Sequence, residues 1–293
     1  MSTLLEKWTL KGKVYLVTGG TKGIGYSTAQ SILAHGAAGI IICSRKEDEC
    51  SNTTAKLLNG WQKDNRNGRE GDGKNGTIES DAPIIKGCAC DISTDEGRTK
   101  LVDFTKHTFD GRLDGIVNNV GMNVRKVIAD QTIEEYQQMM RTNVDSVYFL
   151  CKAFQDILIN TSSKQNGAAV VNVASAAGVQ SSGTGAVYGM SKAAMIHFSK
   201  ILSTEWAKYN IRVNAVAPWM TMTPMLKDAV KSDPNQLDKV KEWTPMHRLA
   251  EPDEIASPIT FLLMPCSGYI TGQCLGIDGG LTAQGFAGPT ISP

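Results

Sequence analysis

A tyrosine and a lysine four positions apart, Tyr188 and Lys192, have the spacing that most directly indicates chemistry in this chain. Side chains at positions i and i+4 of a helix project from the same face, so the ammonium would lie beside the phenol. A nearby ammonium favours the phenolate, and we expect the pKa of Tyr188 to fall from about 10 towards neutrality. Upstream stands Ser175, whose hydroxyl would stabilise charge on a reacting oxygen. Close packing among small residues is the other interpretation of Ser175.

A glycine-rich turn, Thr18–Gly25, follows an apolar run and precedes an amphipathic stretch. This context is typical of a dinucleotide-binding turn. Gly19 permits the tight turn, while Gly23 and Gly25 let the backbone approach a pyrophosphate and the following helix pack closely. Free N–H groups at the start of that helix would face the phosphates. A purely structural glycine turn is the alternative.

The residues after the second predicted strand indicate which nicotinamide cofactor the turn would hold. They read Ser44-Arg45-Lys46, and Lys22 of the glycine turn adds a cation on the same side. A guanidinium suits the 2′-phosphate of NADPH, whereas an acidic residue there would hold the ribose hydroxyls of NADH. We therefore expect NADPH or NADP rather than NADH. The other interpretation is that Arg45 and Lys46 form a solvated helix start.

Composition and charge limit the classes of protein to consider. With 293 residues, 41% of them hydrophobic, the chain suits one large domain over residues 1–293. A net charge of +1 gives no electrostatic support for nucleic acid or a membrane surface as a partner. No run approaches the about 20 apolar residues that span a bilayer, and the N-terminal segment lacks the apolar core of a signal peptide. Seven scattered cysteines and four dispersed histidines predict reduced thiols, a cytoplasmic location and no metal site.

Short β-branched runs alternate with longer amphipathic stretches, which predicts a doubly wound parallel sheet of about seven strands with helices on both faces, the Rossmann type. The strands are expected at Val14–Val17, Gly39–Cys43, Ile84–Gly87, Gly115–Val117, Ala169–Val173, Arg212–Val216 and Cys274–Ile277. The helices are expected at Ile24–His35, Thr132–Ile159, Ala186–Lys208 and Pro252–Leu263. Two further segments stand out: the polar Asn59–Asp81, expected as an exposed loop insertion, and Trp219–Trp243, expected as a substrate lid.

These motifs together resemble the short-chain dehydrogenase/reductase family, over nearly the whole chain from Trp8 to about Phe286. Thr18–Gly25 is similar to the family's cofactor turn, and Asn118–Gly121 resembles its Asn-Asn-Ala-Gly motif with valine in place of alanine. Ser267–Gly280 resembles the closing strand. Long stretches are similar to the tropinone-reductase branch. One departure is Pro218-Trp219, where many members have Pro-Gly.

The resemblance implies an NADPH-dependent oxidoreductase that reduces a ketone to a secondary alcohol. It implies four catalytic residues: Asn143, Ser175, Tyr188 and Lys192. Tyr188 would exchange the proton, Ser175 would bind the substrate oxygen, Lys192 would tune the tyrosine and hold the nicotinamide ribose, and Asn143 would anchor a water. The cofactor-binding residues expected are Gly19, Thr21, Lys22, Gly23, Ile24, Gly25, Ser44, Arg45, Asp91, Ile92, Asn119, Gly121, Tyr188, Lys192, Pro218, Thr221 and Thr223. Those expected to bind substrate are Ser175, Tyr188, Val179, Trp219 and Met225.

The apolar, methionine-rich lid favours a small or medium cyclic or apolar ketone, although the methionines suit ordinary packing equally well. A second hypothesis is a 3-oxoacyl-[acyl carrier protein] reductase, which needs a basic docking patch. The weak candidate for that patch is Lys227, Lys231, Lys239 and Lys241, interleaved with acids. A non-catalytic NADPH-sensing protein is disfavoured because all four catalytic positions are present. The resemblance also implies a homodimer or homotetramer paired through the two long helices.

Overall fold

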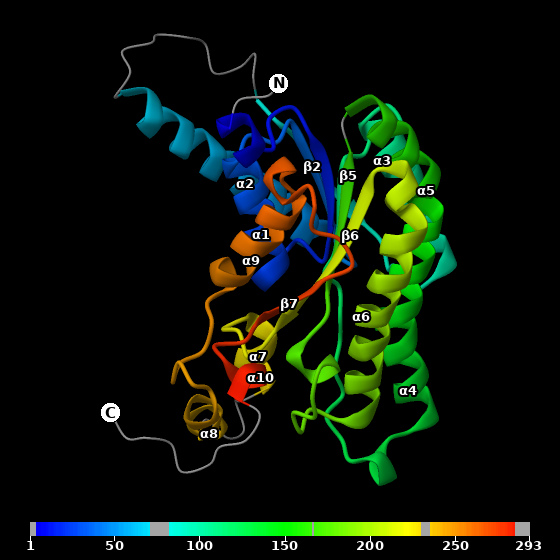
Figure 1. Cartoon of the computed structure of the whole chain (residues 1–293), viewed down its shortest axis with the longest axis vertical. Helices are drawn as coiled ribbons and strands as arrows, with labels where there is room; N and C mark the ends of the chain where they lie inside the picture. The colour runs from blue at the N-terminus through cyan, green and yellow to red at the C-terminus, as the bar shows by residue number, and fades with distance from the viewer. Residues whose placement is uncertain (1–3, 71–81, 166, 230–234, 285–293) are drawn as a thin grey trace.

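A seven-stranded sheet forms the centre of the protein, in the order β3-β2-β1-β4-β5-β6-β7 (Figure 1). The computed structural model describes residues 4–70, 82–165, 167–229 and 235–284. The strands are β1 (Val14–Thr18), β2 (Gly39–Ser44), β3 (Ile84–Ala89), β4 (Gly115–Asn118), β5 (Ala168–Val173), β6 (Ile211–Pro218) and β7 (Cys274–Ile277). All neighbouring pairs are parallel. The strand order reverses between β1 and β4, and ligands bind outside the carboxyl ends of the strands at such a switch point.

Helices cover both faces of the sheet, as predicted. On one face lie α1 (Gly23–Ala34), α2 (Glu47–Glu70) and α9 (Pro252–Leu263), and on the other lie α3 (Asp95–Thr108), α5 (Ser146–Gln165) and α6 (Ala186–Trp206) (Figure 1). Each face has its own hydrophobic core: Leu16 of β1 belongs to one, and its neighbours Tyr15 and Val17 belong to the other. Because both faces are covered, the strands are continuously apolar rather than alternating.

Shorter elements connect these helices and strands. They are η1 (Leu5–Trp8), η3 (Ile128–Asp130), α4 (Ile133–Met140), η4 (Arg141–Asp145), η5 (Ala176–Gly178), η6 (Ala207–Tyr209), α7 (Pro224–Ala229), α8 (Gln236–Trp243), η7 (Pro265–Ser267) and α10 (Leu281–Gln284). Within the described ranges, no helix is long and apolar enough to cross a membrane. Nor do three or more His, Cys, Asp or Glu side chains gather in those ranges as a metal site would require.

The single helix predicted over Thr132–Ile159 is wrong in one respect. The structure divides it into α4, a π-helical segment η4, and α5. A capping box between Thr132 and Glu135 starts α4, and η4 then widens the helix by one residue per turn. This π segment places Asn143 in the interior, where it is fully buried. π-helical turns inside α-helices often mark functional sites.

The loop predicted over Asn59–Asp81 is also wrong in its first half. Helix α2 continues through Asn59 to Glu70. Two apolar anchors, the buried Leu57 and the partly buried Trp61, pack on the core beneath α1, and a helix once formed propagates at little cost through polar residues. The rest of the predicted loop, residues 71–81, lies outside the described residues. Most other predicted boundaries agree within one or two residues, and α9 agrees at both ends.

Candidate active site

Asn119 fastens the carboxyl ends of β1 and β4 to each other. Its backbone N–H donates to Thr18 Oγ1 at 2.9 Å, and its side-chain amide donates to the carbonyl oxygens of Thr18 at 2.9 Å and Gly19 at 3.2 Å. The N–H of Val120 donates to the same Thr18 hydroxyl at 3.2 Å. The end of β4 therefore holds the first residues of the glycine turn in one conformation.

The glycine positions of the turn have little room for a side chain. Gly19 and Gly23 have φ values of +65° and +53°, which favour glycine. A Cβ added to Gly25 would lie 2.6 Å from Asn119 Nδ2 and closer still to the carbonyl oxygen of Gly19. Lys22, the N-cap of α1, makes no side-chain capping bond, and the first N–H groups of a helix have no partner within it. Exposed backbone at a helix N-terminus fits the pyrophosphate of a dinucleotide.

Three of the four predicted catalytic residues come together beside this turn. Ser175 follows β5, and its hydroxyl lies near enough to Tyr188, on the first turn of α6, to lower the pKa of the phenol. Lys192 lies one turn further along α6, with its Nζ 5.7 Å from the centroid of the Tyr188 ring. That Nζ donates to the carbonyl oxygen of Val173 at 2.9 Å, and the side chain is buried.

The electrostatics of this trio correct the prediction for Tyr188. Burial raises its pKa above the ordinary value, against smaller lowering effects of the Ser175 hydrogen bond and the nearby Arg125. Burial also lowers the pKa of Lys192 to about 8. The spacing correctly places the ammonium beside the ring, but removal of both groups from water outweighs their proximity. Tyr188 is therefore protonated at neutral pH.

Asn143, the fourth predicted catalytic residue, clamps the chain after β4. Its Oδ1 accepts from the Met122 N–H at 2.8 Å, and its Nδ2 donates to the Met122 carbonyl and to Ser191 Oγ, each at 3.0 Å. Ser191 in turn donates to the Tyr188 carbonyl at 2.8 Å. The amide thus links η4, the segment after β4 and the catalytic turn of α6. Its oxygen and nitrogen both have protein partners, so these contacts support a positioning role.

The sequence analysis missed Met122 and Ser191 as parts of this clamp. Ser191 lies between Tyr188 and Lys192, and Met122 follows Gly121, so both adjoin recognised motifs. Gly121 itself lies beside Lys192: a Cβ there would lie 3.1 Å from Lys192 Nζ. Gly121 therefore leaves space beside the ammonium.

The cations predicted to hold a 2′-phosphate are arranged differently from the expectation. Lys22 Nζ is paired with Glu49 Oε1 at 2.7 Å, and Ser44 Oγ donates to Glu49 Oε2 at 3.0 Å. Lys46 Nζ lies 3.7 Å from the same carboxylate, whereas Arg45 is exposed. Glu49, on the first turn of α2, is a residue that the sequence analysis did not single out.

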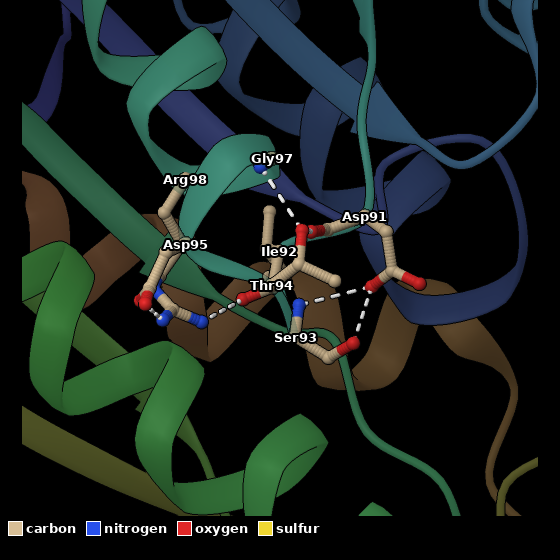
Figure 2. Close-up of polar contacts among 7 residues, drawn as sticks. All are labelled: Asp91, Ile92, Ser93, Thr94, Asp95, Gly97 and Arg98. Carbon is tan, nitrogen blue, oxygen red and sulfur yellow. Dashed lines mark hydrogen bonds and ion pairs between the residues drawn. The ribbon is translucent and has the colours of Figure 1, made fainter.

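Asp91 and Ile92 form the turn between β3 and α3 (Figure 2). The Asp91 carboxylate accepts from the Ser93 N–H at 2.9 Å and the Ser93 hydroxyl at 2.7 Å. The Ile92 side chain is buried in the core, and its carbonyl accepts from the buried guanidinium of Arg98 at 2.8 Å. Arg98 also pairs with Asp95. The exposed carboxylate of Asp91 leaves one oxygen for a ligand, whereas the Ile92 side chain is directed into the protein.

The segment after β6 only partly fits the predicted lid. The Trp219 indole N–H donates to Thr244 Oγ1 at 3.1 Å, and the ring lines a cavity of about 90 Å³ with Thr244, Met246 and Ile277. Neither Ser175 nor Tyr188 lines that cavity, so Trp219 is directed to the base of the lid instead of the catalytic pair. Val179 is 53% exposed. The Met225 side chain and residues 230–234 lie outside the described residues.

Thr223 lies against the glycine turn, where its methyl group would be 3.1 Å from a Cβ added to Gly23. The segment after β6 therefore lies directly over the glycine turn. The other two predicted cofactor residues in this segment are Pro218, which ends β6, and Thr221, which is buried. The Thr221 hydroxyl donates a hydrogen bond to the Trp219 carbonyl at 3.0 Å. In the glycine turn, the Thr21 carbonyl accepts from Thr53, and Ile24 packs on the core.

The chain is similar to known proteins over nearly its whole length. The family model described as enoyl-(acyl carrier protein) reductase matches residues 19–282. Tropinone reductase homologs of Arabidopsis thaliana and Datura stramonium are 35% and 36% identical, covering 96% of this chain and 97% and 96% of their own lengths. The Pseudomonas aeruginosa RhlG/NADP active-site complex has a TM-score of 0.81 at 29% identity, with 94% of this chain and 98% of that chain covered. The 3-ketoacyl-(acyl-carrier-protein) reductase of Brucella melitensis complexed with NADH has a TM-score of 0.77 at 25% identity, with coverage of 94% and 100%.

Proposed function

Because the chain belongs to the short-chain dehydrogenase/reductase family, oxidoreductases that act on CH–OH and C=O groups, we propose that it reduces a ketone to a secondary alcohol with NADPH. The observation that carries this proposal is the junction of Ser175, Tyr188 and Lys192 beside the glycine turn. When bound, the nicotinamide supplies the hydride, which no side chain can supply.

The side chains divide the remaining tasks. Ser175 hydrogen-bonds the substrate oxygen and stabilises the charge that develops there. Tyr188 donates its phenolic proton to that oxygen, and the raised pKa keeps this proton in place at neutral pH. Lys192, beside the tyrosine and buried, holds the nicotinamide ribose and favours the phenolate left after proton transfer. Asn143 keeps the catalytic turn of α6 in position.

The cofactor site runs from the glycine turn to the end of β2. Gly19, Gly23 and Gly25 expose backbone to the pyrophosphate, and Thr223 covers it. Arg45 and Lys22 supply cations for the 2′-phosphate, which favours NADPH over NADH. The P. aeruginosa structure is described as an NADP complex and the B. melitensis structure as an NADH complex, so the cofactor choice needs a direct measurement.

A small or medium cyclic or apolar ketone is the proposed substrate class. The relatives from A. thaliana and D. stramonium are called tropinone reductase homologs, which supports a cyclic ketone. A second candidate is reduction of a 3-oxoacyl thioester on a carrier protein. The names of the matching family model and of the B. melitensis neighbour favour it. The basic patch for carrier docking has little support, because Lys241 pairs with Asp238 and Lys231 lies outside the described residues.

The deciding experiment follows the loss of NADPH absorbance over a ketone panel, with NADH in parallel. The panel contains tropinone, quinuclidinone, cyclohexanones and an acetoacetyl thioester. Turnover of cyclic ketones with NADPH, abolished in Tyr188→Phe, is the expected result. Turnover of the thioester alone would replace the proposal with the second candidate. NADPH binding without turnover of any ketone would indicate a non-catalytic sensor.

The assembly state and compartment are further parts of the proposal. Tyr148 and Phe149 on α5 and Ile201 on α6 are large apolar side chains more than 40% exposed, which supports pairing through these helices into a homodimer or homotetramer. A monomer in light scattering would contradict this assembly. The seven cysteines are all free, which supports a reducing compartment such as the cytoplasm. One relative is called chloroplastic, and imaging of a tagged chain distinguishes the two locations.

A further inference from the structure

Glu49 lies between two lysines and a serine in a charged cluster at the carboxyl end of β2. Its two oxygens accept from Lys22 Nζ at 2.7 Å and Ser44 Oγ at 3.0 Å, with Lys46 Nζ at 3.7 Å. The Glu49 side chain is 22% exposed, whereas those of Lys22 and Lys46 are 59% and 69% exposed. The carboxylate is therefore the least exposed charged group of this cluster, and both lysines are more exposed than it is.

The residues of this cluster include those proposed to receive the 2′-phosphate. Lys22 belongs to the glycine turn, and Ser44 ends the strand next to β1, as the pairing of Thr18 with Cys43 shows. A phosphate binds ammonium and hydroxyl donors of the kind that the Glu49 carboxylate already uses. The Lys22 hydrogen bond lowers the pKa of Glu49, so the carboxylate is ionised at neutral pH. Two anions cannot share these donors without repulsion.

We propose that Glu49 is a specificity-determining residue, an internal competitor that a 2′-phosphate must displace from Lys22 and Ser44. This inference rests on the proposed use of NADPH and adds a property to that site. Glu49 weakens the binding of NADPH while leaving the binding of NADH nearly unchanged, so it narrows the discrimination between the two cofactors. Glu49 is on the first turn of α2, so displacing its carboxylate requires movement of one side chain at a helix terminus.

The test measures dissociation constants by calorimetry for the wild type and for Glu49→Gln. The ligands are NADPH, NADH, and the isolated probes 2′-AMP and 5′-AMP. We expect Glu49→Gln to bind NADPH and 2′-AMP about five- to tenfold more tightly, because an exposed ion pair no longer has to break and a like charge is gone. The binding of NADH and 5′-AMP should change less than about twofold, since neither carries a 2′-phosphate.

Glu47→Gln is the matched control, because Glu47 is exposed on the same helix turn and its loss changes the net charge equally. Its effect on NADPH should stay below about twofold, as expected for a screened surface charge. Glu49→Asp, a second variant, keeps the charge but shortens the reach to Lys22. It should also bind NADPH more tightly than the wild type does.

The outcomes separate the two proposals. An unchanged NADPH-to-NADH ratio in Glu49→Gln, with a wild type that prefers NADPH, overturns the role of Glu49 and leaves the proposed function intact. If the wild type prefers NADH and Glu49→Gln does not, both the proposed use of NADPH and the role of Glu49 as a competitor are overturned, because Glu49 would then hold the ribose hydroxyls. An equal gain in Glu47→Gln also overturns the inference, because the effect would be one of overall charge.

Discussion

Replacing Lys192 with methionine should stabilise the ligand-free protein while abolishing its activity. The lysine side chain is only 3% exposed, and burial lowers its pKa from 10.5 to about 8. One pKa unit corresponds to about 1.4 kcal/mol, so keeping this group charged at neutral pH costs the folded state about 3 kcal/mol. Methionine is apolar, of similar length, and would pack beside Met195, whose sulfur already lies 3.6 Å from Nζ.

One interaction opposes this gain. Lys192 Nζ donates to the Val173 carbonyl at 2.9 Å, and methionine cannot replace that bond. The loss costs about 1–2 kcal/mol, which leaves a net stabilisation of about 1–2 kcal/mol for Lys192→Met. For a chain of this size, that corresponds to a rise in Tm of a few degrees, at about 2–4 °C per kcal/mol.

The pH dependence makes the prediction specific. Between pH 8 and 10.5 the unfolded chain keeps the Lys192 proton while the folded chain releases it. The stability of the wild type relative to Lys192→Met therefore rises with pH across this window. Urea unfolding at about pH 7 and about pH 9.5 should show the advantage of the variant shrinking at the higher pH.

A second lysine on α6 provides the control for this prediction. Lys200→Met, at an exposed position of α6, should change stability little and identically at both pH values. If Lys192→Met is less stable than the wild type at neutral pH, or if the difference does not change with pH, burial does not penalise the ammonium. Desolvation would then be refuted as the cause of the lowered pKa of Lys192.

Three further changes test the rest of the site. Gly25→Ala should destabilise the protein by about 1–3 kcal/mol and weaken NADPH binding, because its Cβ would meet the backbone of the turn. The control Gly60→Ala should change neither property, because a Cβ added there has no atom within 4 Å. Scanning fluorimetry with and without NADPH compares the two variants. Asn143→Ala should lower kcat while the KM for NADPH changes little, because the bond from its amide to Ser191 on α6 and its two bonds to Met122 after β4 are lost; a fall in kcat no larger than the loss of folded protein would contradict the positioning role. Trp219→Phe removes the bond to Thr244 and should lower the free energy of unfolding by about 1 kcal/mol in urea unfolding, with the NADPH dissociation constant unchanged.

The strands and the ligand edge of the sheet are predictable from the sequence because their signals are local. A continuously apolar run such as Ile40–Ile42 fits a strand covered on both faces, and the glycine turn follows the first of these runs directly. The catalytic trio is predictable in type because Tyr188 and Lys192 share a helix face. These signals need only neighbouring residues, and the structure confirms the elements they predict.

The features that the sequence does not predict depend on packing between distant segments. The π segment at Arg141–Asp145 has no composition that marks it, since the widened turn is held by bonds from Asn143 to Met122 and Ser191. The raised pKa of Tyr188 depends on how much water reaches the ring, which helix spacing does not report. Glu49 resembles any acidic residue at a helix start because Lys22 stands 27 positions away in sequence, and only the sheet brings the two together.

The charges of Lys192 and Lys22 have opposite surroundings in the protein. Lys192 is buried with no acidic partner among the described residues, so its ammonium raises the energy of the ligand-free protein. Lys22 is half-exposed and neutralised by Glu49, so its charge is satisfied before any ligand arrives. A 2′-phosphate at Lys22 would therefore have to break an ion pair before it could bind. On the proposal above, Glu49 sets how much of the attraction between Lys22 and a 2′-phosphate remains for binding, whereas the charge of Lys192 serves the tyrosine and the uncharged ribose.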